Sequence, residues 1–464
     1  MHRQCKGKRR RYTKWQLLLG LLALLACAGR ALAQPAAAPA GQVSETQLRH
    51  FLSRALTLQE LLLQPAADRQ QLLPWASRLG TRFAGRVGGF WATPGSDARE
   101  RAWYDSTRRA VQLLRASQPE IVVQGAVFEI VFAEVEGLTV PNAIRAEFGE
   151  DTLHPRRRHF RLADMMYREY FLSGDSTRYR WDSRPPGQAP GTPDMSRRET
   201  QMWFYFCARR QLDAGCEALH FGQVDLMDDR DPGHAAWWSM LSRVRRYART
   251  RNRGFVLCDA HTHGEYYDPD PAHPAPDSLR QLLFDFHGFP ARPTPTDTLR
   301  QGQHGTRIDY WTRVDPYAPI YQQSRGGITP SGWRCQHLPA LVELDNGGDA
   351  LPFAPSPWPS LWGMDEISWF ATQPQAYRSH WLTYAYGRVR QIDPDAYFEA
   401  PGLRVVHAYR QPVRQYRADL DSQGPTLRRA WQAEPDPATE ALLLLGPPTE
   451  AQQRQLEAAG LRQP

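Results

Sequence analysis

The chain has 464 residues, of which 41% are hydrophobic and 11% aromatic, a composition typical of a globular protein. Its formal net charge of +8 comes from residues 1–33, which contain 8 of the 57 basic residues and no acidic residue. The remaining chain is therefore neutral overall, and its charge gives no support for nucleic-acid binding. No lysine follows Lys14, which excludes a Schiff-base lysine and a lysine-bearing phosphate loop from the rest of the chain.

The chain begins with the features of an export signal. A basic stretch (6–14) precedes a short apolar run (17–27), and Ala31-Leu32-Ala33 then provides a small-residue cleavage site. We therefore predict a signal peptide over 1–33 and an exported protein that is periplasmic, extracellular or held at the cell surface. An alternative is lipoprotein processing at Cys27, because Leu24-Leu25-Ala26-Cys27 resembles a lipobox; a lipid anchor there is the only membrane contact we predict. An uncleaved N-terminal anchor is the third possibility.

After the signal, the sequence predicts a flexible tether at 34–45, an N-terminal helical segment at 46–78 and a C-terminal tail at 433–464. Between them, over 79–432, short apolar runs alternate with helical patterns, and a long insertion without periodicity occupies 289–332. The predicted strands are 82–91, 120–131, 218–224, 255–260, 278–286, 339–345, 365–370 and 396–406.

Eight strands, most of them separated by helices, predict an α/β fold of the (β/α)8 TIM-barrel type with long loop insertions. A doubly wound open sheet is the alternative. That fold would call for a glycine-rich phosphate turn after an early strand, and the sequence has none.

The segment from Cys216 to Gly264 is the most informative part of the chain. Two short apolar runs flank a helical stretch, which predicts two neighbouring parallel strands. Polar residues interrupt or directly follow these runs: His220, Gln223, Asp259, His261 and His263. Polar side chains at the carboxyl ends of parallel strands are typical of the active sites of barrel enzymes.

Carboxyl groups near the predicted strand ends suggest glycoside hydrolysis. This reaction needs two carboxyl groups on either side of the scissile bond, one of them kept protonated by burial. We predict Glu343, late in an apolar strand, and Asp259 as the catalytic pair, with Glu129 in reserve. The alternative for Glu343 is a structural salt bridge to an arginine.

Further side chains at these strand ends are predicted to bind substrate. Asp345 shares a strand face with Glu343 because side chains in a strand alternate. Trp369 lies near the exit of a predicted strand, where its ring would stack on a sugar. The predicted substrate-binding residues are His220, Gln223, His261, His263, His287, Asp345 and Trp369.

His261-Thr262-His263 also matches the His-x-His motif with which metal-dependent amidohydrolase barrels bind zinc. A metal-dependent hydrolase centred on His261 and His263, with His287 as a further ligand, is therefore an alternative function. Those barrels carry the motif on the first strand and use a bridging lysine, whereas here it follows about the fourth strand and no lysine is present. We accordingly predict no metal and no cofactor.

Three segments, 215–223, 255–261 and 365–370, resemble secreted bacterial (β/α)8 glycoside-hydrolase-like proteins over roughly residues 80 to 410. In the large retaining-glycosidase clan, an acid/base follows the fourth strand and a nucleophile the seventh, so the resemblance implies an acid/base role for Asp259. The chain departs from that clan because the Asn-Glu pair is absent and the predicted seventh strand has no acid at its exit. We predict an exported carbohydrate-active hydrolase with a glycan substrate; a non-catalytic glycan-binding barrel is a further alternative.

Overall fold

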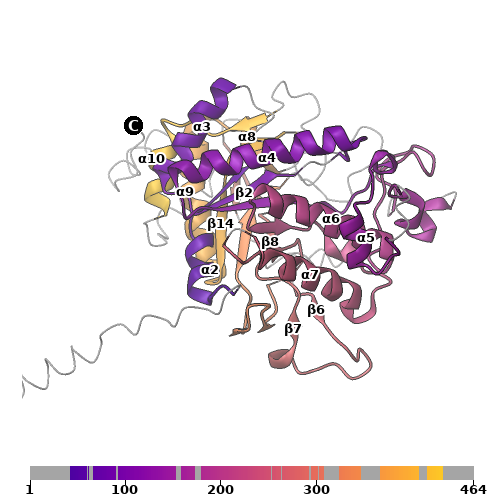
Figure 1. Cartoon of the computed structure of the whole chain (residues 1–464). Helices are drawn as coiled ribbons and strands as arrows, with labels where there is room; N and C mark the ends of the chain where they lie inside the picture. The colour runs from indigo at the N-terminus through magenta and orange to yellow at the C-terminus, as the bar shows by residue number, and fades with distance from the viewer. Residues whose placement is uncertain are drawn as a thin grey trace, which may run out of the picture. The chain divides into compact units, whose positions relative to one another are not determined.

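We analysed a computed structural model of the chain (Figure 1). It describes residues 42–59, 61, 66–89, 92–152, 158–172, 179–251, 253–262, 264–291, 294–300, 303–307, 323–345, 366–406 and 415–431. The predicted signal peptide (1–33) and C-terminal tail (433–464) lie outside the described residues. None of the helices in the described ranges is long and apolar enough to cross a membrane.

Eight parallel strands form a nearly closed barrel, which confirms the predicted fold class. They follow one another around the sheet in the order β5-β4-β3-β2-β1-β14-β13-β8. A parallel bridge between His261 and Gly288 joins the chain after β5 to β8, at the two ends of that order. The strands are β1 (Ala55–Leu58), β2 (Phe83–Gly88), β3 (Val122–Ala126), β4 (Ala218–His220), β5 (Leu257–Asp259), β8 (His287–Pro290), β13 (Ala340–Glu343) and β14 (Ala396–Val405).

Helices connect most neighbouring strands and cover the outside of the barrel (Figure 1). Their ends follow ordinary capping rules: Ser96 caps α4 by accepting a hydrogen bond from the Arg99 N–H, and Gly215 ends α6 with a φ of 104°. The α-helices are α2 (Glu45–Leu52), α3 (Ala66–Leu79), α4 (Asp97–Ser117), α5 (Asn142–Glu147), α6 (Arg198–Ala214), α7 (Ala235–Ala248), α8 (Glu366–Thr372), α9 (Gln375–Ile392) and α10 (Gln423–Ala430).

The connections from β5 to β8 and from β8 to β13 contain short strands instead of α-helices in their described parts. β9 and β10 pair as an antiparallel hairpin within the predicted insertion, and β15 pairs antiparallel with β14. These short strands are β6 (Tyr266–Tyr267), β7 (Gln281–Leu282), β9 (Thr294–Arg300), β10 (Gln303–Arg307), β11 (Gly327–Ile328), β12 (Arg334–Cys335) and β15 (Gln415–Arg417). Short 3-10 turns are η2 (Ala133–Gly137), η3 (Leu162–Asp164), η4 (Arg168–Phe171), η5 (Val224–Leu226), η6 (Pro232–His234) and η7 (Asp277–Leu279).

Three predicted elements were wrong, although the number of barrel strands was right. The strand predicted at 278–286 is misplaced, because the barrel strand of that region, β8, begins only at His287. The described part of the predicted strand 365–370, residues 366–370, belongs to helix α8, and the segment predicted as helical at 46–78 contains the barrel strand β1. The last two errors have the same cause, since a short apolar run suits a buried helix and a buried strand equally well.

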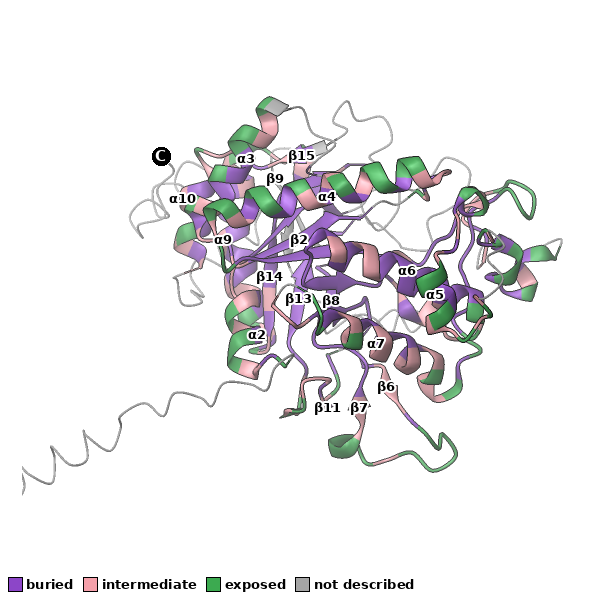
Figure 2. Ribbon diagram, in the orientation of Figure 1, coloured by how far each residue is buried: buried purple, intermediate pink, exposed green. Residues whose placement is uncertain are grey.

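The core has a layer inside the barrel and a layer between barrel and helices, and the strands are buried on both faces (Figure 2). The inner layer lies at the amino ends of the strands, where inward-facing side chains pack against Leu48 and Leu52 of α2. These side chains are Ala55, Phe83, Val122, Ala218, Leu257 and Leu341. The interior is thus apolar at this end, and side chains alternate along each strand, so the next inward positions lie two residues further on.

Candidate active site

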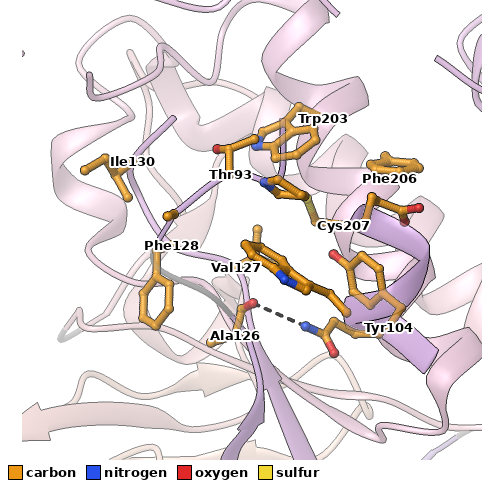
Figure 3. A pocket seen from close by; sticks show the side chains of 15 residues that line it. Thr93, Tyr104, Ala126, Val127, Phe128, Ile130, Trp203, Phe206 and Cys207 are labelled. Carbon is orange, nitrogen blue, oxygen red and sulfur yellow. Dashed lines mark hydrogen bonds between the residues drawn. The ribbon is translucent and has the colours of Figure 1, made fainter. Parts of the chain in front are cut away.

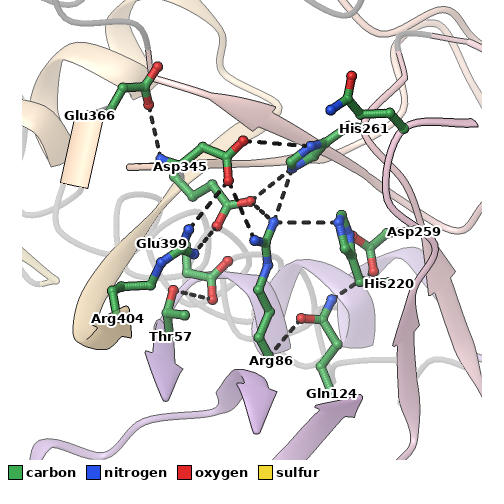
Figure 4. Close-up of polar contacts among 12 residues, drawn as sticks. Thr57, Arg86, Gln124, His220, Asp259, His261, Asp345, Glu366, Glu399 and Arg404 are labelled. Atoms are coloured by element: carbon green, nitrogen blue, oxygen red, sulfur yellow. Dashed lines mark hydrogen bonds and ion pairs between the residues drawn. The ribbon is translucent and has the colours of Figure 1, made fainter. Parts of the chain in front are cut away.

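Two residues beyond the apolar inner layer, the interior of the barrel becomes polar (Figure 4). The inward-facing residues at this level are Thr57, Gly85, Gln124, His220, Asp259, Glu343 and Glu399, each two positions after a residue at the amino end of its strand. Gly85 leaves room for its neighbours, since a β-carbon there would overlap the Glu399 carboxylate. The polar side chains therefore gather toward the carboxyl ends of the strands, where barrel enzymes bind their substrates.

Glu343 is the centre of this cluster. Its carboxylate is buried and accepts hydrogen bonds from Arg86 Nη2 and, at 2.6 Å, from Arg404 Nη1. His261 Nε2 lies 2.9 Å from Glu343 Oε1. Burial alone would raise the pKa of Glu343, but the two guanidinium groups outweigh it and lower the pKa to about 2. Glu343 is therefore ionised at neutral pH. The arginine salt bridge that the sequence analysis gave as the alternative for Glu343 is present, with both Arg86 and Arg404.

Arg86 reaches the centre because of an irregularity in β2. The pairing of β2 with β3 shifts register between Ala84 and Gly88, and Arg86 has a φ of 55°, which is rare for a residue other than glycine. Its backbone N–H donates to Gln124 Oε1 at 3.0 Å. The side chain then points into the barrel, with Nη2 3.1 Å from His261 Nε2 (Figure 4). Strained backbone of this kind clusters at functional sites.

Asp345 extends the charged cluster beyond the end of β13. Its carboxylate accepts hydrogen bonds from Arg404 at 3.3 Å and Arg86 at 3.5 Å, and its backbone N–H donates to Glu366 Oε2 at 3.0 Å. Glu366 therefore lies at the carboxyl end of the barrel.

Glu399 is a second carboxyl group beside Glu343 that the sequence analysis did not select. The two residues are register partners on the adjacent parallel strands β13 and β14. Glu399 Oε1 accepts a hydrogen bond from Thr57 Oγ1 at 2.8 Å, and its side chain is buried. Burial and the nearby Glu343 carboxylate raise the pKa of Glu399 to about 7. The sequence pattern that selected Glu343, an acidic residue inside an apolar strand, is also present at Glu399.

Asp259 and His220 form a buried pair on β5 and β4. His220 Nδ1 lies 2.7 Å from Asp259 Oδ2, while Gln124 Nε2 donates to Oδ1 at 2.7 Å. Burial raises the pKa of Asp259 well above its ordinary value and lowers the pKa of His220 well below its own. Burial therefore disfavours the charged form of each group, and both oxygens of Asp259 are held by neighbours.

Glu129 and Gln223 meet at the edge of the cluster, after β3 and β4. The Gln223 backbone N–H donates to Glu129 Oε2 at 3.2 Å, and its side-chain amide donates to Oε1 at 3.3 Å. Gly222, with a φ of 63°, allows this approach because a β-carbon there would overlap Glu129. Burial raises the pKa of Glu129. The structure thus brings both predicted residues together at one position.

Two predicted substrate-binding residues are not part of this cluster. His287 faces the outer layer, where it packs near Phe284 and Phe289 and its Nδ1 lies 3.0 Å from Ser324 Oγ. Trp369 packs against Trp381 in the core between barrel and helices, because its segment is a helix. These two predictions were wrong. His263 lies outside the described residues.

The cluster also contains a group of potential metal ligands. Donor atoms of His261, Glu343 and Asp345 lie within 4.8 Å of one another. Arg86 Nη2 contacts both His261 and Glu343, so a guanidinium cation already provides positive charge among these atoms. A metal ion bound by all three would compete with Arg86 for the same carboxylate oxygen.

A separate pocket lies beside the barrel, between α4, α6 and the segments that follow β2 and β3 (Figure 3). Tyr104, Phe128 and Trp203 are among the side chains that surround it. Gln211 lies at the pocket too, with its amide Nε2 donating to the Ala126 carbonyl. None of the predicted site residues belongs to its lining.

No protein-family model matches the chain, and no curated protein shows significant sequence similarity to it. The chain is similar in structure to a putative α-amylase from Salmonella typhimurium, at 10% identity and a TM-score of 0.30, over 53% of this chain and 37% of that one. It is also similar to the Arthrobacter globiformis T6 isomaltodextranase complexed with panose, at 13% identity and a TM-score of 0.29, over 55% and 42%. A third similar structure is the Nostoc punctiforme debranching enzyme, at 11% identity and a TM-score of 0.26, over 46% and 49%. The chain spans less than half the length of each of these three structures.

Proposed function

We propose that this chain is an exported carbohydrate-active hydrolase that cleaves glycosidic bonds with a pair of carboxyl groups at the carboxyl end of the barrel. The observation that carries the proposal is the difference between two adjacent inward-facing carboxyl groups. Glu343 has a pKa of about 2 and Glu399 a pKa of about 7. Neighbouring carboxyl groups with separated pKa values are the usual basis for dividing acid and base roles.

In the proposed reaction, Glu399 donates its proton to the glycosidic oxygen, and the bond from that oxygen to the anomeric carbon breaks. The ionised Glu343 carboxylate attacks the anomeric carbon, and water then releases the sugar while Glu399 takes up a proton from it. Strands in a sheet lie about 4.8 Å apart, so side chains in register on adjacent strands lie close together, and the carboxyl groups of retaining enzymes are also close, at roughly 5 to 5.5 Å. The register pairing of Glu343 with Glu399 therefore favours retention.

Asp259, predicted as the partner of Glu343, is the alternative proton donor. Burial raises the pKa of Asp259 as well. Its carboxyl group pairs with His220 Nδ1 at 2.7 Å, so we assign it to holding His220 in position. Asp345, Glu129, Gln223 and His261 would then contact sugar hydroxyl groups around the reacting bond. Export rests on the predicted signal at 1–33.

The test is hydrolysis of a panel of 4-nitrophenyl glycosides and α- and β-linked polysaccharides by the purified protein and by Glu343→Gln, Glu399→Gln and Asp259→Asn. We expect Glu343→Gln and Glu399→Gln each to lower kcat by about 100-fold or more, and Asp259→Asn to have a smaller effect. The matched control is Glu217→Gln, which changes a fully buried carboxylate that pairs with Arg253 and lies next to the amino end of β4.

Two results would contradict the proposal. Activity that survives in the Glu343→Gln and Glu399→Gln double variant would remove the proposed pair from the mechanism. Sugar binding without turnover by the unmodified protein would instead favour the non-catalytic glycan-binding barrel.

The metal-dependent hydrolase remains a second candidate because of the donor group formed by His261, Glu343 and Asp345. It predicts activity that is lost on chelation and restored by zinc or manganese. It also predicts that His261→Asn removes the metal that supports activity. A chelator-resistant activity would exclude this candidate.

A further inference from the structure

A second cluster of ionisable side chains lies outside the barrel centre, in the loops that follow β4 and β5. Asp228 and His234 come from the segment between β4 and α7, and Glu265 from the segment after β5. Donor atoms of these three residues lie within 4.8 Å of one another, and all three are partly exposed. Asp225 joins them from the same loop as Asp228. Neither the proposed reaction nor the sequence analysis uses any of these residues.

The orientation of the His234 ring resembles that of a metal-binding histidine. Its Nδ1 lies 2.9 Å from the carbonyl oxygen of Tyr266. A carbonyl oxygen only accepts hydrogen bonds, so Nδ1 carries the proton. Nε2 therefore faces the acids, 3.1 Å from Asp228 Oδ2 and 2.8 Å from Glu265 Oε2. Metal-binding histidines commonly donate the other ring N–H to a backbone carbonyl in this way, which fixes the ring and the coordinating nitrogen.

An independent sign of a ligand comes from Asp225. Its Oδ2 atom is fully buried and finds no hydrogen-bond donor among the described residues. Its other oxygen lies 3.3 Å from Thr262 Oγ1, and the same hydroxyl is 3.2 Å from Glu265 Oε1. Burial and the Glu265 carboxylate raise the pKa of Asp225 well above its ordinary value. Buried carboxylate oxygens without a donor are costly unless a cation or a proton satisfies them.

The types of donor atom in this cluster indicate which metal it would hold. One imidazole nitrogen with carboxylate oxygens is a ligand set that suits zinc or manganese.

We propose that Asp228, His234 and Glu265, with Asp225 beside them, form a binding site for a divalent transition-metal cation such as Zn²⁺ or Mn²⁺. The ion would join the loop after β4 to the loop after β5. Thr262, which contacts two of the three carboxyl groups, directly follows His261 of the barrel centre. The site would therefore hold the rim of the barrel in place without taking part in bond cleavage, and it does not depend on the proposed function.

The test is direct metal binding by the full chain. After treatment with EDTA and removal of the chelator, the protein is titrated with ZnCl₂ by calorimetry, and bound zinc is measured by mass spectrometry. His234→Asn removes the ligand while keeping a residue that tolerates the positive φ of 54° at this position. Glu265→Gln is a second variant from the other loop. His273→Asn is the matched control, because His273 pairs with Asp270 at 3.0 Å on an exposed surface.

We expect one zinc ion per chain, with affinity at least about tenfold lower in His234→Asn and Glu265→Gln and unchanged in His273→Asn. Thermal unfolding should shift upward with zinc in the unmodified protein and not in His234→Asn. His261→Asn alters the barrel centre alone, so its effect on zinc uptake distinguishes an ion at the barrel centre from an ion at the proposed site. No zinc uptake, uptake unchanged in both His234→Asn and Glu265→Gln, or uptake lost only in His261→Asn would overturn the proposal.

Discussion

The pKa of Glu399 predicts how the stability of the protein depends on pH. The folded-state pKa of about 7 lies above the ordinary value of 4.5, so the folded protein holds this proton more tightly than the unfolded chain. The stabilisation is complete below pH 4.5 and is lost as the pH rises through 7. At about 1.4 kcal/mol per pH unit, the loss amounts to about 3 kcal/mol. The side chain is buried, so solvent screening does not reduce this value by much.

Glu399→Gln isolates this contribution because glutamine resembles the protonated carboxyl group and keeps an oxygen that can accept from Thr57. We expect the variant to match the unmodified protein at pH 4.5 and to be about 3 kcal/mol more stable above pH 8. Urea unfolding followed by circular dichroism from pH 4.5 to 8.5 measures the difference. A difference between the two proteins that stays constant over this range would refute the assignment of a protonated Glu399. A variant that is more stable at high pH but inactive would be the expected combination for a proton donor.

Three further predictions concern the same barrel. Glu343→Gln should lower the free energy of unfolding at pH 7 by about 3–5 kcal/mol, because it leaves two buried guanidinium groups under-compensated. The unmodified protein should lose stability as the pH falls from 4.5 toward 2, because Glu343 becomes protonated. Glu343→Gln should not show this loss, and urea unfolding at low pH would detect the difference. Gly85→Ala should cost about 1–3 kcal/mol by overlap with Glu399, and a double-mutant cycle should show that this cost disappears in Glu399→Ala. Brief exposure of the native protein to iodoacetamide should modify Cys335 before the three fully buried cysteines of the described chain, as peptide mass spectrometry would show; equal labelling would contradict the burial.

Much of the fold could be predicted because it depends on local patterns. The alternation of strands and helices, and polar residues near strand ends, are visible in a short window of sequence. The βαβ unit from β4 through α7 to β5 was predicted close to its observed limits, with His220 and Asp259 at the strand ends. The strand β1 was missed because its four residues, Ala55 to Leu58, lie between two helices in an apolar stretch that suits either structure.

The composition of the centre could be predicted only in part. Glu343, Asp345, Asp259, His220 and His261 were selected, since each lies at or near the end of an apolar run. Their partners were missed because the pairing depends on register between distant strands. Glu399, Arg404 and Arg86 lie inside strands. A charged residue inside a strand indicates that a partner residue is buried beside it, but the sequence does not identify that partner.

The ion pairs around Glu343 have a consequence for how the protein folds. Arg86 precedes Glu343 by 257 residues and Arg404 follows it by 61, while Thr57 and Glu399 are 342 residues apart. Contacts between such distant parts of the chain form late, because the loop they close must first be ordered. A chain that has emerged only as far as β13 has neither Arg404 nor Glu399, so its Glu343 can pair only with Arg86 and His261. The electrostatic centre is therefore complete only in the full ring of strands, and partly assembled barrels form only some of its ion pairs.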